Sequence, residues 1–107
     1  LSNSEHDVEA AQRFLEAKER YQVGSQMWAE ATAQAMKTLM QKACAEVAKP
    51  DWWNDEGLKA LSASVVRVLP DDMLASNMRA VVLYGREVAW KVGPRSAAEL
   101  RGAATHW

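Results

Sequence analysis

Residues 3–49 read NSEHDVEAAQRFLEAKERYQVGSQMWAEATAQAMKTLMQKACAEVAK, with no proline and a single glycine, Gly24. Alanine, glutamate, glutamine, methionine, leucine and lysine dominate, and all of these are good helix formers. The acidic residues Glu5, Asp7 and Glu9 stand at its beginning, where negative charge favours the N-terminal end of a helix dipole. The composition therefore predicts a long N-terminal helix.

Large apolar side chains recur through this stretch every seven residues, with alanine or glycine interleaved at the same interval. A seam of alternating large and small side chains suits close packing against another helix. We expect the seam and a second apolar stripe after it to form the interface between two copies of the chain, through Phe14, Tyr21, Trp28, Met36, Leu39 and Met40.

The length of the expected helix raises a packing problem. An unbroken helix of about 45 residues would be roughly 67 Å long, at 1.5 Å per residue. A compact domain of 107 residues is only about 34 Å across. Either the surplus apolar surface packs on another molecule, or the helix breaks at Gly24–Ser25 and folds back as a hairpin. We prefer the long helix, because neither Val23 nor Gln26 is a turn residue.

Three prolines, Pro50, Pro70 and Pro94, divide the rest of the chain, and each is a plausible helix stop. Between them, apolar residues spaced three and four apart predict medium helices over residues 51–69 and 71–92.

A short last helix is expected after Pro94, because Ser96 and Glu99 have the spacing of a capping box. The alternative for residues 80–92 is a β-hairpin, since apolar and polar residues alternate near Trp90. The sequence thus predicts a single all-α domain over residues 1–107. It would comprise one long, two medium and one short helix, packed as a dimeric helical bundle; the hairpin would make it α+β.

Overall composition excludes several classes of protein. With 49% hydrophobic and 25% charged residues, the chain has an ordinary globular mixture. A net charge of −1 argues against a nucleic-acid binder or a membrane-surface binder. No apolar run reaches the length of about 18 residues that a membrane span needs. The single cysteine, Cys44, forms no intrachain disulfide, and we expect a cytoplasmic protein.

The sequence contains no catalytic motif. It has no Ser-His-Asp order, glycine-rich phosphate loop or metal-ligand spacing, and its two histidines, His6 and His106, stand near opposite ends. We therefore expect no enzymatic activity, no cofactor and no metal. A group of acidic residues near the prolines is expected to cap helices: Asp51, Asp55, Glu56, Asp71 and Asp72.

Tryptophan is unusually abundant, with five residues in the chain. Trp52 and Trp53 are adjacent, in what we expect to be the first turn of a helix that Asp51 caps. Successive helical residues point about 100° apart, so at most one of the two can face fully inward. Because exposed indoles are common at interaction hot spots, we expect Trp52, Trp53 and the terminal Trp107 to bind a partner.

In size, in its Ala/Gln/Met-rich helix from Glu5 to Lys49 and in its lack of catalytic motifs, the chain resembles the small helical quorum-sensing anti-activators of the QslA type. The resemblance implies a non-enzymatic module that binds a LuxR-type transcription factor, sequesters it and blocks its dimerisation without touching DNA. The alternative is a small DNA-associated regulator that uses the basic C-terminal stretch of Arg86, Lys91, Arg95 and Arg101.

The expected apolar surplus predicts that the protein is a homodimer with residues 3–49 at its interface. Sedimentation equilibrium at micromolar concentration should give twice the chain mass of 11.9 kDa. A clean monomer would contradict the prediction.

Overall fold

The computed structural model describes residues 3–41, 44–85 and 90–106, and these form α-helices and connecting loops without a β-strand. The expected all-α class is therefore confirmed. The helices are α1 (Asn3–Arg20), α2 (Gln26–Leu39), α3 (Asp55–Val68), α4 (Met73–Tyr84) and α5 (Ala97–His106).

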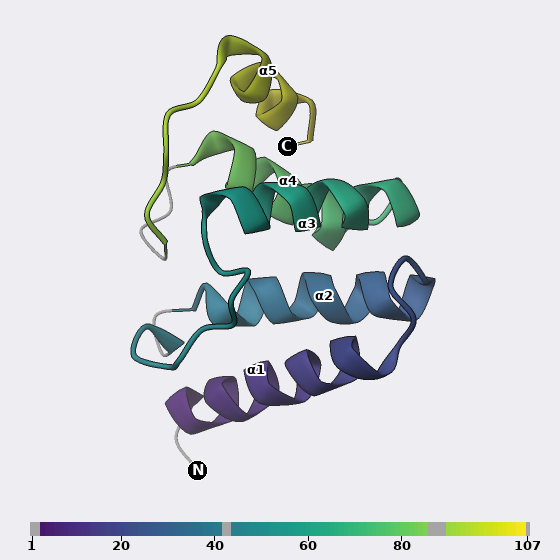
Figure 1. The fold of residues 1–107 in the computed structure, drawn as a ribbon, viewed down its shortest axis with the longest axis vertical. Coiled ribbons are helices and arrows are strands. Elements are labelled where there is room, and N and C mark those ends of the chain that lie inside the picture. Colours follow the sequence, from purple (N-terminus) through teal and green to yellow (C-terminus); the bar gives the residue numbers. More distant parts are fainter. Residues whose placement is uncertain (1–2, 42–43, 86–89, 107) are drawn as a thin grey trace.

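The helices are stacked in layers along the longest dimension of the molecule, which measures 42 Å (Figure 1). Helices α1 and α2 lie side by side in the lower layers, α3 and α4 pack together above α2, and α5 packs on α4 at the far end. Helix α2 is central, because it contacts α1 on one side and both α3 and α4 on the other.

Buried side chains form three clusters, which lie on the two sides of α2. The α2–α3–α4 junction holds one cluster near the beginning of α2 and a second near its end, and a third lies between α1 and the end of α2. Their buried members are Trp28, Ala29, Ala33, Val65 and Ala75; Met36, Leu58, Met78, Val82 and Trp90; and Ala11, Leu39 and Cys44.

The long helix expected over residues 3–49 is wrong, because the chain turns back between α1 and α2. Gly24 has a φ of 89°, a left-handed conformation that favours glycine. The next residue, Ser25, caps α2, with its Oγ accepting a hydrogen bond from the Trp28 amide at 3.2 Å. The helical hairpin removes the length argument for a dimer, since α1 now covers α2 within one molecule.

Two further boundaries differ from expectation around Pro50. Helix α2 ends at Leu39 rather than at Lys49, and α3 begins at Asp55 rather than at Asp51. Asn54 is the N-cap of α3, since its Oδ1 accepts a hydrogen bond from the Gly57 amide at 2.8 Å.

Gly57 has a packing role in the first turn of α3. A side chain at this position would collide with the backbone of Trp52, so glycine permits the preceding loop to lie against the helix. The close approach fixes the loop that carries both adjacent tryptophans.

Helix α4 also ends earlier than expected, at Tyr84 rather than at residue 92. Gly85 terminates it in a left-handed conformation, with its amide donating to the Val81 carbonyl. The alternative hairpin over residues 80–92 is wrong for residues 80–84, which are helical, while residues 86–89 lie outside the described residues. The Ser96–Glu99 capping box is confirmed by two reciprocal hydrogen bonds, of 2.9 and 3.1 Å.

The turn between α1 and α2 predicts a specific ranking of substitutions. We expect Gly24→Ala and Ser25→Ala each to lower the free energy of unfolding by about 1 kcal/mol, because one strains the backbone and the other removes a cap. Gly24→Asn and Ser25→Asp are the matched controls and should cost less, since asparagine tolerates positive φ and aspartate caps helices. Urea unfolding measures the stability of all four variants. The described turn would be contradicted if Gly24→Ala cost the same as Gly24→Asn and Ser25→Ala the same as Ser25→Asp.

Candidate functional site

Most large exposed apolar side chains in the described part of the chain gather at the turn between α1 and α2. Tyr21 is 38% exposed, Val23 75% and Met27 49%, and all three lie within seven residues. The other two, Met73 and Leu100, lie on α4 and α5. Large apolar side chains exposed close together are typical of interaction sites.

Beside this turn, an open hollow of about 410 Å³ runs between α1 and α2 and reaches the beginning of α4. We call it the α1–α2 groove. It is lined by Phe14, Ala17, Tyr21, Met27, Glu30, Ala31, Ala33, Gln34, Asp72 and Leu74.

The groove exists because small side chains stand between large ones. Ala17 on α1 and Ala31 on α2 lie between the larger Phe14, Tyr21 and Met27. Alanine fills less space than its neighbours, so the surface is hollowed where the two helices meet. Such a ring of large side chains around small ones resembles the hole that receives a side chain in helix–helix packing.

Both charged residues that line the groove are acidic. Glu30 accepts a hydrogen bond from the neutral Gln26 amide at 3.2 Å. Asp72 caps α4, with its Oδ2 accepting a hydrogen bond from the Ala75 amide at 2.9 Å. The apolar groove therefore has carboxylates at its edge.

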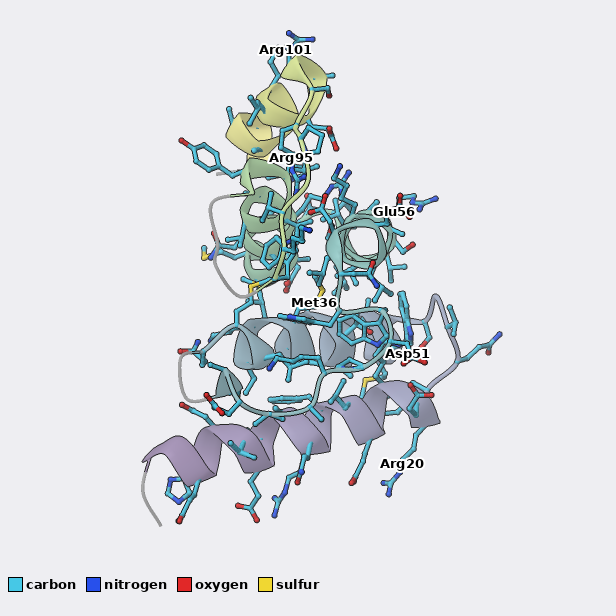
Figure 2. The ribbon with its side chains drawn as sticks, turned by 60° about the vertical axis from the view of Figure 1, so that its left-hand side comes forward. Arg20, Met36, Asp51, Glu56, Arg95 and Arg101 are labelled. Atoms are coloured by element: carbon cyan, nitrogen blue, oxygen red, sulfur yellow. The ribbon has the colours of Figure 1, made fainter. Side chains whose placement is uncertain are left out.

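Neighbouring basic side chains of α1 do not neutralise these carboxylates. The Lys18 ammonium lies over the rings of Trp28 and Trp52, 5.9 and 5.5 Å from their centroids. Figure 2 shows Arg20 projecting from α1 away from the rest of the molecule. The groove thus keeps an acidic character.

The residues expected at a dimer interface fall into two groups, one accessible at the surface and the other buried in the core. Phe14 and Tyr21 line the groove, and Met40 is half-buried against the core. In contrast, the three residues Trp28, Met36 and Leu39 are enclosed by the helices of their own chain, so a second copy cannot reach them. The turn at Gly24 restarts the helix, so the spacing of seven does not continue from α1 into α2.

The adjacent tryptophans lie in the loop before α3, not in its first turn. Both are half-buried, and their ring centroids are 5.7 Å apart. Trp53 also meets Trp90 edge to face at 6.4 Å. Neither indole is fully buried, and the sequence had allowed at most one of the two to face fully inward. A role of Trp52 and Trp53 in partner binding stays a prediction, and Trp107 lies outside the described residues.

The best-connected polar cluster centres on Asp55, which was expected to cap α3. Arg95 instead donates to both carboxylate oxygens, at 2.6 and 2.8 Å. The Trp90 indole and the Gly93 amide add hydrogen bonds of 3.0 and 3.2 Å. These hydrogen bonds, that from Arg95 above all, hold the pKa of Asp55 well below its usual range despite desolvation.

A second carboxylate belongs to the same network. Glu99 pairs with the Lys59 ammonium at 2.7 Å and accepts a hydrogen bond from the Ser96 amide. Chiefly the bond from Lys59, and then that from Ser96, lower the pKa of Glu99 to about 2. Both carboxylates are thus engaged in joining α3 to the C-terminal segment, and the network is structural.

Other chemical groups give no catalytic arrangement in the described parts of the chain. No cluster of three or more histidine, cysteine, aspartate or glutamate side chains there could hold a metal ion. Cys44 is fully buried, and burial, followed by the charge of Asp7, raises the pKa of its thiol. A thiol in this setting is a poor nucleophile.

No protein-family model matches the chain, and no curated protein or solved structure is significantly similar to it. Within the described residues, none of the helices combines the length and apolar character required to cross a membrane. Functional inference therefore starts from the groove. The sequence pointed to two residues of the groove, Phe14 and Tyr21, as part of a dimer interface, but it gave no sign of the contribution of α4.

The Asp55 network predicts a marked loss of stability in acid. The folded-state pKa of Asp55 is below the unfolded value of about 3.9, so its contribution is present above about pH 4 and is lost as pH falls further. Asp55→Asn should lower the free energy of unfolding at pH 7 by about 3 kcal/mol. Between about pH 5 and pH 2.5, the free energy of unfolding should fall less steeply in this variant than in wild type. Urea unfolding at each pH tests this, with the exposed Asp51→Asn as control. Equal pH dependence in wild type and Asp55→Asn would contradict it.

Proposed function

We propose that this protein is a non-enzymatic interaction module that binds a partner protein in the α1–α2 groove and sequesters it. The observation that carries the proposal is the placement of exposed Tyr21 and Met27 around a hollow floored by alanine. Aromatic and methionine side chains are enriched where proteins bind each other, and methionine adapts its shape to a partner.

The geometry of the groove supports binding of side chains rather than chemistry on a small molecule. The groove is open, and its lining residues with polar side-chain groups are Tyr21, Glu30, Gln34 and Asp72. No serine, threonine, cysteine, lysine or histidine is among its lining residues. Such a surface can bind and cover a partner.

We propose a transcription factor of the LuxR type as the partner, on the resemblance to anti-activators stated above. A module that covers one subunit's dimerisation surface would block dimerisation by competition, with no covalent step. The homodimer expected from the sequence stays a prediction, and the sedimentation experiment tests it.

The DNA-associated alternative has less support. Arg95 has a side chain only 6% exposed, because it is bound to Asp55. Figure 2 shows the Arg101 side chain projecting outward from α5, far from α1. Arg86 lies outside the described residues. The C-terminal stretch therefore has fewer basic groups available for phosphate than its composition implied.

Filling the groove tests the proposal. Ala17→Met adds a larger side chain at a half-buried position between Phe14 and Tyr21, and should abolish partner binding without lowering the melting temperature. Glu16→Met adds the same side chain to the opposite, exposed face of α1 and is the matched control. Tagged wild type and both variants are used to capture proteins from a lysate of the producing organism, followed by quantitative mass spectrometry.

A protein captured by wild type and Glu16→Met but not by Ala17→Met is the expected partner. Gel filtration of that partner with and without this protein should then show conversion of partner dimers into mixed complexes. Identical capture by wild type and Ala17→Met would show that the groove is not the binding site.

A further inference from the structure

We infer that the occupant of the α1–α2 groove is an amphipathic helix with lysine or arginine beside its apolar face. The inference rests on the proposed function and specifies the chemistry of the partner. Three features carry it: the length of the groove, its alanine-floored hollow and the sign of its charged edge.

The length of the groove matches two turns of a helix. Its lining residues run from Met27 to Gln34 on α2, and from Phe14 on α1 to Tyr21, which directly follows α1 and whose amide still donates to the Ala17 carbonyl. Seven residues of helix span about 10.5 Å. Each wall of the groove is therefore as long as the separation between positions i and i+7 of a docked helix. Helix-in-groove recognition uses anchors at i, i+3 or i+4, and i+7.

An extended peptide would fit less well. Strand addition needs a sheet edge with free amides and carbonyls, whereas both walls here are helices whose backbone groups are paired internally. A helix satisfies its own backbone hydrogen bonds, so it can lie on an apolar helical surface without leaving amides unpaired.

The hollow suits one branched or flexible apolar side chain of the incoming helix. Ala17 and Ala31 leave the space, and Phe14, Tyr21 and Met27 surround it. In helix packing, a side chain inserts into a hole formed by four residues of the facing helices. A leucine or methionine of the partner would fill the hollow in this way.

The edge of the groove selects a basic partner. Both charged lining residues, Glu30 and Asp72, are carboxylates, while Lys18 and Arg20 are directed elsewhere. Within the described ranges, the hydrogen bond to the Glu30 carboxylate comes from a neutral amide, and Asp72 uses Oδ2 for its cap. Charges at an interface rim mainly set which partner binds and how fast.

A second copy of this chain is a poorer occupant. Docking groove to groove about a two-fold axis would bring the same two carboxylates of each copy to the contact. The chain has a net charge of −1, so it carries no excess of basic groups to offset them.

Two synthetic helical peptides test the inference, one made of leucine and lysine and the other of leucine and glutamate, with the same apolar spacing. Fluorescence anisotropy measures their affinity for the whole protein. We expect the leucine–lysine peptide to bind about tenfold tighter, and its affinity to fall with added salt. Ala17→Met should abolish its binding.

Variants that remove negative charge from the groove test whether Glu30 and Asp72 cause the preference for the basic peptide. The double variant Glu30→Gln/Asp72→Asn keeps the α4 cap, because asparagine also caps helices, and should weaken the leucine–lysine peptide about threefold to tenfold. The matched control, Glu16→Gln/Glu19→Gln, removes the same charge from the far face of α1 and should leave the affinity unchanged.

Equal affinity in wild type and Glu30→Gln/Asp72→Asn, or equal binding of the two peptides, would overturn the inference. If Ala17→Met still abolishes partner capture in that case, the proposed function stands and only the class of occupant is wrong. If Ala17→Met binds both peptide and partner like wild type, both proposals fail. Self-association that Ala17→Met abolishes would identify the second copy as the occupant.

Discussion

The ion pair between Asp55 and Arg95 fixes the C-terminal third of this protein to its centre. The Arg95 guanidinium also donates to the Val82 and Leu83 carbonyls at the end of α4, at 2.8 and 2.9 Å. One side chain therefore joins the end of α4 to the first turn of α3 and fixes the start of the segment that leads to α5. A buried charge pair stabilises a fold only when its hydrogen-bonding groups are satisfied, and here each Asp55 oxygen accepts two bonds.

This attachment decides which surface of the molecule stays open. Because the segment after α4 is tied to α3, α5 packs on α4 at the far end instead of returning to α2 (Figure 1). Helix α2 is then covered by α1 on one side and by α3 and α4 on the other. The groove runs along the part of α2 from Met27 to Gln34, on the side of the helix that faces the gap between α1 and the beginning of α4.

Local signals in the sequence predicted much of the fold but little of the site. Helical composition gave the all-α class, and the Ser96–Glu99 box marked the start of α5. The turn at Gly24 had its local signal too, but the burial of Trp28 depends on distant residues of α3 and α4, among them Val65 and Ala75. The partners Asp55 and Arg95 are 40 residues apart, so no local pattern connects them. The groove requires three helices, and spacing along one of them cannot predict it.

The side chains that line the groove do not give the chain its greatest possible stability. A larger apolar residue at Ala17 would contact Phe14 and Tyr21 and remove more apolar surface from water, which stabilises a fold by about 25 cal/mol per Å². The chain instead keeps alanine there while exposing Tyr21 and Met27 beside it. Elsewhere α2 fills its core with Met36 and Leu39, both fully buried. The proposed binding of a partner accounts for this arrangement, because a side chain of the partner would fill the space above the alanines, and functional surfaces in natural proteins are often not optimised for stability.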